Sequence, residues 1–262
     1  MFKYIKTWAS VISFLATPVI SDAGTRTFTP PKLIRTTYEV TKNGQPFAKV
    51  KEQFSVSGNA YKIESITKGI GIYGLFGERK LTSTGEVTTE GLKPSHFELQ
   101  QGDNAKKALI SDFDWPNKTL HMLVKGAVKD AALIAGTQDL ASYAYQFMFN
   151  PAALKDTTAL ALTTGKKLNQ YQYKINASHE TITSGNTQYK TMHLMPAVLE
   201  ENKSSTDGSA STETKVPSQA KVSTETKELW LSLDHYYLPV RIMLIDDNGS
   251  KLEQTLTDLH IE

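Results

Sequence analysis

The sequence has no cysteine and almost no net charge. Without cysteine there is no disulfide, no thiolate metal site, no cysteine nucleophile and no lipid-acceptor thiol. The 29 basic and 27 acidic residues give a formal net charge of +2. This balance argues against nucleic acid as a partner, because phosphate binding needs a basic face.

The first 23 residues show the pattern of a secretory signal. Lys3 and Lys6 make a basic start, residues 7–21 carry no charge, and small residues follow at the spacing that signal peptidase needs. This uncharged run of 15 residues is shorter than the roughly 20 that a membrane-spanning helix requires. We expect residues 1–23 to be a cleaved signal peptide and the mature protein, from about Gly24, to be periplasmic. The alternative is an uncleaved amphipathic or membrane-anchoring segment.

No second apolar segment approaches spanning length, so we expect no transmembrane segment after cleavage. Most of the remaining chain instead alternates apolar and polar residues between turns, which is typical of strands with one buried face. Asn43-Gly44 tolerates the positive φ angles of a tight hairpin turn, and Asp247-Asn-Gly249 is a second turn. The expected strands include 33–40, 60–67, 118–128, 170–177, 188–195, 228–234, 238–245 and 251–259.

One segment follows a helical spacing instead. Its apolar residues recur at i, i+3, i+4, i+7 and i+8, which makes one stripe of an amphipathic helix; they are Leu140, Tyr143, Ala144, Phe147 and Met148. We therefore predict an all-β fold, with a single strongly curved, half-barrel-like antiparallel sheet of about ten strands. A helix over 138–149 packs on its concave face. A two-sheet sandwich is the alternative.

Residues 201–227 differ from the rest in composition. Eleven of these 27 residues are Ser or Thr, none is aromatic, and Ser-Thr-Glu-Thr-Lys occurs twice. Such a segment buries too little apolar surface to offset its ordering entropy. We interpret it as a disordered insertion within one β-rich domain over 24–262; a repeated binding motif is the alternative.

A glycine-rich stretch over 69–77 contains G-x-G-x-x-G, but a strand follows it where a dinucleotide site needs a helix. Nine residues without charge here are either a loop tucked into the core or a mobile apolar flap over a ligand site. Tryptophans in apolar company are core residues or cavity lining. The predicted ligand-binding residues are Ile70, Ile72, Tyr73, Leu75, Phe76, Trp115, Tyr143, Phe147 and Trp230.

Chemistry-bearing motifs are missing from the sequence. His179-Glu180 lacks the second histidine of a zinc-protease motif, because position 183 is Thr. There is no G-x-S-x-G elbow, and the acidic pairs stand next to turns. We predict no catalytic residue, no metal site and no cofactor, and a protein that is more plausibly a binder than an enzyme.

Several short elements together resemble a bacterial envelope family known as domain of unknown function 3108. They occur in the family's order over residues 33–262: Gly85-Glu-Val, Gly91-Leu-Lys-Pro94, Asp112-Phe-Asp-Trp115, Gly136-Thr-Gln-Asp139, Glu228-Leu-Trp-Leu-Ser-Leu-Asp234, Leu238-Pro-Val-Arg241 and Asp247-Asn-Gly249. The resemblance implies a signal-bearing, β-rich periplasmic protein without assigned activity. A looser similarity, in architecture only, is to the half-barrel lipoprotein carriers of the Gram-negative periplasm.

Two functions remain open at this point. A curved sheet, one helix and an apolar loop would suit a binder of a lipid or other apolar molecule. The alternative is a structural or adaptor protein of the cell envelope with a filled core, which would bind its partners at strand edges.

Overall fold

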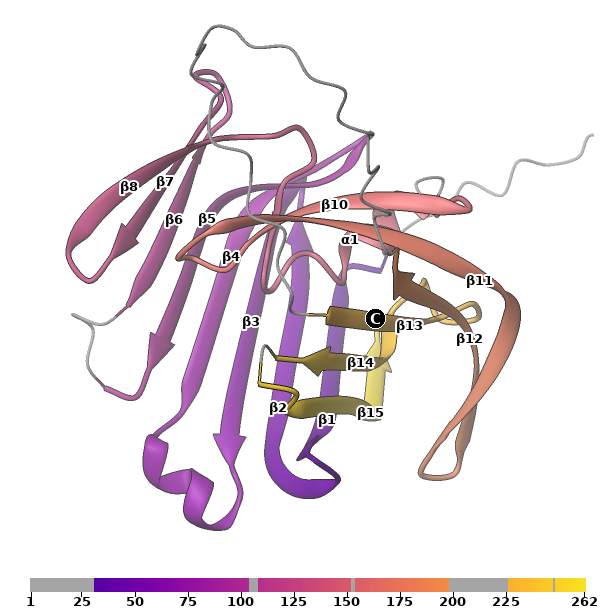
Figure 1. The fold of residues 1–262 in the computed structure, drawn as a ribbon. Helices are drawn as coiled ribbons and strands as arrows, with labels where there is room; N and C mark the ends of the chain where they lie inside the picture. Colours follow the sequence, from indigo (N-terminus) through magenta and orange to yellow (C-terminus); the bar gives the residue numbers. More distant parts are fainter. Residues whose placement is uncertain (1–30, 104–107, 152–153, 198–225, 247) are drawn as a thin grey trace, which may run out of the picture.

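The structure is a computed structural model that describes residues 31–103, 108–151, 154–197, 226–246 and 248–262. Within these residues fifteen strands form one sheet, in the order β8-β7-β6-β5-β4-β3-β2-β1-β15-β14-β13-β12-β11-β10-β9 (Figure 1). The strands are β1 (Leu33–Lys42), β2 (Gln45–Ser57), β3 (Ala60–Gly69), β4 (Arg79–Thr88), β5 (Gly91–Gln101), β6 (Leu109–Asp114), β7 (Thr119–Val124), β8 (Ala127–Ala132), β9 (Gln138–Asp139), β10 (Thr157–Thr163), β11 (Leu168–Ser184), β12 (Thr187–Pro196), β13 (Thr226–Ser232), β14 (Pro239–Ile245) and β15 (Lys251–Ile261).

Alternation of buried and exposed side chains builds this sheet as the sequence predicts. In β1 the residues Ile34, Thr36, Tyr38 and Val40 are buried, and the residues between them are more exposed. Because successive side chains of a strand point to opposite faces, these four share the inner face of the sheet. The fold prediction of one strongly curved sheet is confirmed, although the described residues hold more strands than the ten expected.

Tight turns with positive φ join many of the neighbouring strands. Asn43 and Gly44 have φ values of 51° and 80°, as the predicted turn requires. A second pair of this kind, Lys125 and Gly126 at 54° and 81°, divides the stretch 118–128. The strand predicted there is therefore a hairpin made of β7 and β8.

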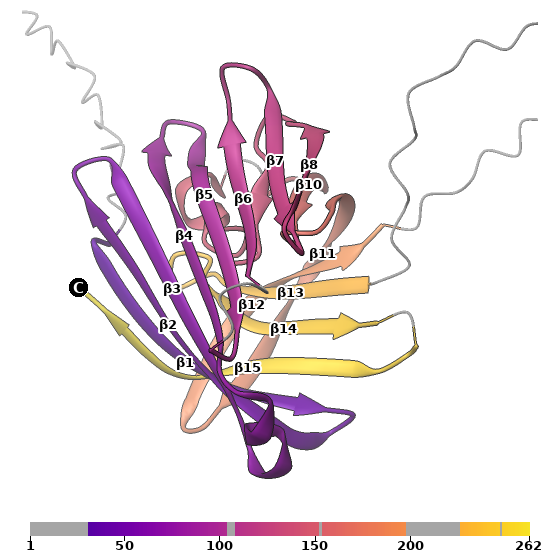
Figure 2. The ribbon, with the colours of Figure 1, turned by 90° about the vertical axis from the view of Figure 1, so that its left-hand side faces the viewer.

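The pairing of β1 with β15 joins the two halves of the chain. Ile34 lies opposite Ile261 and Lys42 opposite Leu252 along this antiparallel pair. Strands β2 to β8 continue from one side of it and strands β14 to β9 from the other, and the sheet curls around the space between them (Figure 2). The single parallel pair among the described strands is the short contact of β9 with β10.

Residues 136–150, called the inner segment below, fill part of the concave side of the sheet, where the sequence predicts a helix over 138–149. The regular helix α1 is only Gln146–Phe149, and residues 140–145 form turns. The helix is shorter than predicted, and most side chains of residues 137–148 are buried. Side chains of the inner segment bond to the sheet around it, with Gln138 Nε2 donating to Leu92 O at 2.8 Å and Leu92 N donating to Gln146 Oε1 at 2.5 Å. Specific contacts of this kind, rather than helical periodicity, set its backbone.

Two predicted segments lie largely outside the described residues. The signal peptide over 1–23 is wholly outside them, and so is most of the Ser/Thr-rich insertion over 201–227. The last two residues of that insertion, Thr226 and Lys227, are described and belong to β13. No helix among the described residues is long and apolar enough to cross a membrane.

Candidate functional site

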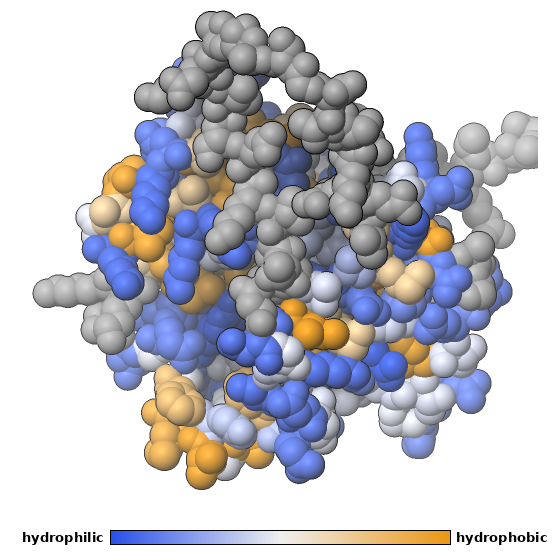
Figure 3. Space-filling model, in the orientation of Figure 1, coloured by the Kyte–Doolittle hydropathy of each residue, from blue (hydrophilic) through white to orange (hydrophobic). Residues whose placement is uncertain are grey.

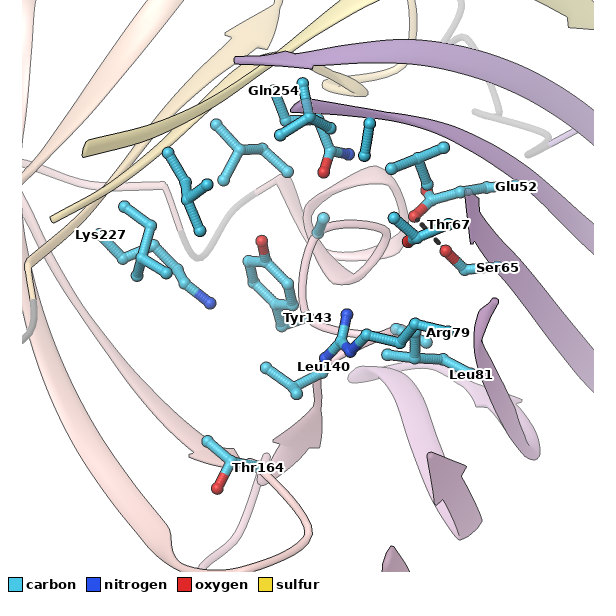
Figure 4. Close-up of a pocket in the computed structure, with 18 of the residues that line it drawn as sticks. Glu52, Ser65, Thr67, Arg79, Leu81, Leu140, Tyr143, Thr164, Lys227 and Gln254 are labelled. Atoms are coloured by element: carbon cyan, nitrogen blue, oxygen red, sulfur yellow. Dashed lines mark hydrogen bonds between the residues drawn. The ribbon is translucent and has the colours of Figure 1, made fainter. Parts of the chain in front are cut away.

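A cavity of about 390 Å³ opens on the concave side of the sheet, next to the turns that precede α1 (Figure 4). Its wall comes from strands on both sides of the β1–β15 pair. Apolar residues make up most of the lining: Val40, Phe47, Ala48, Val50, Leu81, Leu140, Ala141, Ala144, Ile242, Leu244 and Leu252. A volume of this size lies within the range of small-molecule sites, roughly 300–1,000 Å³.

Strand alternation explains why these walls are apolar. Ile242 and Leu244 are two residues apart on β14, and Leu244 lies opposite Leu252 of β15. Val40 of β1 lies opposite Ala48 of β2 on the other side of the cavity. Because side chains two apart share a face, each strand presents a continuous apolar row to the same space.

Three charged residues interrupt the apolar rows: Glu52, Arg79 and Lys227. Each occupies an inward position, since Arg79 is two residues before the buried Leu81 and Lys227 is two residues before the buried Leu229. In Figure 4, Arg79 reaches from β4 and Lys227 from β13 toward Tyr143. Charged side chains are rare inside a sheet of this kind, so their presence marks the cavity as more than a packing gap.

Glu52 is held by two hydroxyl groups. Ser65 Oγ, on the opposite residue of β3, donates to Glu52 Oε1 at 3.0 Å, and Tyr145 OH donates to Oε2 at 3.2 Å. Removal from water raises the pKa of the Glu52 carboxyl, while these two hydrogen bonds and the positive charge of Arg79 act in the opposite direction. Glu52 therefore has its own partners at one end of the cavity.

Arg79 and Lys227 place positive charge around Tyr143. Lys227 Nζ lies 4.4 Å from the centroid of the Tyr143 ring, and the Lys227 residue is buried. Removal from water lowers the pKa of the Arg79 guanidinium, and the field of Glu52 partly restores it. An arginine stays charged even so, because its ordinary pKa is above about 12. The burial of Tyr143 raises the pKa of its hydroxyl, which therefore remains a hydrogen-bond donor.

The structure separates the nine ligand-binding residues predicted from the sequence. Tyr143 lines the cavity just described. Phe147 lines a second hollow beside β10, and Trp115 lines a third beside β5, where its Nε1 donates to Pro94 O at 2.6 Å. The other six predicted residues line neither the cavity nor either of the two hollows.

The glycine-rich stretch is an exposed tip between β3 and β4. It forms a 3-10 helix, η1 (Gly71–Phe76), with none of its residues buried. Ile72, Leu75 and Phe76 are 73%, 87% and 71% exposed, and they make the apolar patch at the lower left of Figure 3. The interpretation of this stretch as a loop in the core is therefore wrong. The tip borders the cavity at one point, where the Tyr73 ring lies 4.6 Å from that of Phe47, a lining residue.

Trp230 lies on the face of β13 that points away from the cavity, beneath the β11–β12 hairpin. Its ring stacks on His193 with 3.9 Å between centroids, and its Nε1 donates to Glu180 Oε2 at 2.8 Å. This hydrogen bond, followed by that of His193, lowers the pKa of Glu180. The hairpin is also tied to β15, since Ser184 Oγ donates to Leu256 O. Trp230 is thus a packing residue that fixes the hairpin.

Carboxylates lie within hydrogen-bond distance of four histidines, His96, His121, His193 and His260. His193 Nδ1 lies 3.0 Å from Glu180 Oε1 and its Nε2 lies 2.8 Å from Glu228 Oε2, while His121 Nδ1 lies 2.8 Å from Asp130 Oδ1. Among the described residues, no group of three or more histidine, aspartate or glutamate side chains is arranged to hold a metal ion.

Sequence reasoning missed Glu52, Arg79 and Lys227. The available signal was the alternation itself, because a charged residue in step with Leu81 and Ser83, or with Leu229 and Leu231, must point inward. The composition of residues 201–227 instead groups Lys227 with the polar insertion, although it belongs to β13.

Comparison with known proteins gives a family without an assigned role. A family model described as "Protein of unknown function (DUF3108)" matches residues 37–257. Among solved structures, the chain is similar to a crystal structure of a beta-barrel-like protein of domain of unknown function DUF1849 from Brucella abortus. The TM-score is 0.48 and the identity 10%, over 89% of this chain and 99% of that chain. No curated protein matches the chain.

Proposed function

Because the chain belongs to the DUF3108 family of proteins of unknown function, we propose a function from its cavity: it is an exported, non-enzymatic protein that binds a lipid or another largely apolar molecule. The observation that carries this proposal is the apolar lining on the concave side of the sheet. A filled core would place side chains in that space, because protein interiors are close-packed with few voids larger than a water molecule.

The arrangement of walls supports a binding role. Strands β1, β2, β14 and β15 supply one rigid surface, and Leu140 to Ala144 close the space from the inner segment. Binding sites built on strands hold their geometry better than sites built on loops. An apolar ligand placed there would remove apolar surface from water at roughly 25 cal/mol per Å², which is the driving force for binding.

The exposed tip η1 is proposed as the border of the entrance. Its Tyr73 packs on Phe47, and Gly71 at φ 60° and Gly77 at φ 72° adopt backbone conformations that other residues rarely take. Apolar side chains at an entrance would let an apolar ligand pass without meeting charge. Residues 70–76 therefore remain proposed site residues at the rim, rather than in the lining.

Export is proposed from the N-terminal pattern, with Lys3, Lys6 and the uncharged stretch after them as its support. Mass determination of the protein recovered from a periplasmic extract tests it. A mature chain beginning near Gly24 is expected, and full-length protein retained in the cytoplasm would contradict export.

Filling the cavity tests the binding proposal. The neutral fluorophore N-phenyl-1-naphthylamine brightens in apolar surroundings and carries no acid group. We expect saturable binding by the natural protein and a dissociation constant raised about tenfold or more in Leu252→Trp, because the larger ring occupies the space. Val128→Trp is the control, since Val128 is 65% exposed on the edge strand β8.

Two results would overturn binding in this cavity. One is a natural protein that shows no saturable increase in fluorescence. The other is equal binding by Leu252→Trp and Val128→Trp in proteins whose circular dichroism and melting temperatures match.

One observation favours the alternative of an envelope adaptor. The exposed apolar tip is of the kind that marks interaction surfaces. An adaptor would not take up the fluorophore in the cavity, so the same titration separates the two functions.

A further inference from the structure

We infer that the molecule bound in the cavity carries an acid group, a carboxylate or a phosphate, and that Arg79 is the residue that recognises it. This inference rests on the proposed function and names the chemical class of the ligand. It starts from the fact that a purely apolar molecule would gain nothing from a partly buried guanidinium in the wall of its cavity.

Arg79 points into the cavity without an ion pair. It lies opposite Thr67 on β3, and both residues line the space. Among the described residues, none places a carboxylate oxygen within 4.0 Å of the guanidinium nitrogens, and none accepts a hydrogen bond from them. Burial of a charge costs free energy unless it is paired. A ligand anion would supply the missing partner.

Glu52, whose negative charge acts on Arg79, does not serve as that partner. Glu52 acts on Arg79 through its field, but its two oxygens accept hydrogen bonds from Ser65 and Tyr145. Because burial raises the pKa of Glu52, its negative charge is also less favourable there than in water. The carboxylate is thus oriented by hydroxyl groups, and the planar fork of the guanidinium is left facing the cavity.

The surroundings of Arg79 complete a site for an anion. Tyr143, toward which Arg79 reaches in Figure 4, keeps its hydroxyl proton, so this hydroxyl can donate to an acid oxygen. Lys227 adds a second positive charge at 4.4 Å from the same ring. A guanidinium binds a carboxylate or phosphate through two parallel hydrogen bonds, which are about twice as strong as neutral ones.

The remainder of the ligand would lie along the apolar rows. Ile242, Leu244 and Leu252 line the cavity from β14 and β15 without a charged residue among them. An acid group at Arg79 and a hydrocarbon chain on these strands describe an anionic amphiphile. Two sources share this chemistry, a free fatty acid and a lipid with a phosphate head group.

Competition with the bound fluorophore tests this inference. The probes are hexadecanoate, hexadecanol and a single-chain phosphatidic acid with the same hydrocarbon chain. For the natural protein we expect the acids to displace the fluorophore at concentrations about tenfold or more below that of hexadecanol. Arg79→Met should abolish this preference, so that the acids and hexadecanol displace the fluorophore at similar concentrations.

Two matched variants keep the result interpretable. Lys80→Met removes a charge from the next residue of the same strand. The Lys80 side chain points outward, and its Nζ lies 3.9 Å from Glu78 Oε2. This variant should therefore keep the preference for acids. Arg79→Lys retains the charge but not the fork, so it should keep part of the preference. Melting temperatures show whether each variant is folded.

The outcomes separate the two proposals. Tight binding of hexadecanoate but not the phosphatidic acid identifies a carboxylate ligand, and the reverse identifies a phosphate ligand. Equal affinity of the natural protein for hexadecanol and both acids, or an equal loss in Arg79→Met and Lys80→Met, would overturn the role of Arg79 while binding stands. Failure of the fluorophore itself to bind would overturn the proposed function.

Discussion

Asp139 is the residue that fixes the inner segment to the sheet. Its carboxylate accepts hydrogen bonds from Ser83 Oγ at 2.6 Å, from Ala141 N at 2.8 Å and from Ser142 N at 2.9 Å. Ser83 also contacts Tyr61 OH at 3.0 Å, so the inner segment is joined to β3 and β4 through one buried carboxylate. Since Leu140 to Ala144 close the cavity, the position of Asp139 controls the shape of the site.

The pH dependence of stability follows from this carboxylate. Burial raises the pKa of Asp139 from 3.8 to about 6, against the lowering effect of its hydrogen bonds. A folded-state pKa above the unfolded one means that the folded protein binds the extra proton, so stability is greatest below pH 3.8 for this group and falls as the pH rises to 6. The loss is of order 3 kcal/mol.

We therefore predict that the natural protein loses stability relative to Asp139→Asn between pH 4 and 6. The amide keeps the shape of the side chain and an oxygen for the backbone donors but does not titrate. Denaturant unfolding of both proteins at intervals of pH measures the difference. A difference that stays constant over this range would show that Asp139 does not titrate as its burial implies.

Among single residues, the inward-pointing charged side chains show which features can be predicted from the sequence and which cannot. Alternation places Arg79 on the face of Leu81 and Ser83, so its inward direction could have been predicted. That it meets Lys227 around one tyrosine could not, because β4 and β13 come together only through the curvature of the sheet. Positions on a strand follow from local sequence, whereas positions across a cavity depend on long-range pairing.

Among the elements, the inner segment and the tip η1 depart most from their sequence patterns. The spacing of Leu140, Tyr143 and Phe147 is helical, and Asp139 accepts a hydrogen bond from Ala141 N as a helix N-cap does. The regular helix is nevertheless only Gln146–Phe149, and Gln146 binds the backbone of β5. The tip is apolar and yet exposed, which hydropathy alone cannot distinguish from a core loop. In both cases the deciding interactions are tertiary.

A charge at the tip tests its place at the entrance. Phe76→Asp should leave the free energy of unfolding within about 0.5 kcal/mol, because Phe76 is 71% exposed. It should slow the uptake of N-phenyl-1-naphthylamine in stopped-flow measurements, because the apolar molecule would have to pass a hydrated carboxylate at the entrance. Val128→Asp, at a position 65% exposed on the strand at one end of the sheet, should leave the rate unchanged. Equal rates in the two variants would exclude the tip from the entrance.

At the scale of the molecule, the pairing of β1 with β15 decides the fold. Local sequence predicts the hairpins, and each hairpin would fit either a single curved sheet or a two-sheet sandwich. The choice depends on strands from the two ends of the described chain, Leu33–Lys42 and Lys251–Ile261, which lie more than 200 residues apart. No hairpin turn joins these two strands, so the register of their pairing could not be predicted from local sequence.

The Ser/Thr-rich insertion joins two strands that are already adjacent. His193 of β12 lies opposite Trp230 of β13, so a short loop could connect them. We predict that deletion of residues 203–225 leaves the melting temperature within about 3 °C, a change of less than roughly 1 kcal/mol. A deletion extended to 203–227 should cost more, because it removes Thr226 and the buried Lys227 from β13. Loss of cooperative unfolding in the shorter deletion would show that the segment is part of the fold.

The location of a bound ligand tests most directly whether this molecule is a cavity-binding protein. The measurement is a crystal structure of the complex with a dodecanoate that carries bromine on its terminal carbon, with bromine located by its anomalous scattering. We predict one bromine site inside the cavity, among Ile242, Leu244 and Leu252, and a carboxylate at Arg79. Bromine found only on the exposed apolar tip, or no ordered bromine in crystals grown at saturating ligand, would contradict this function.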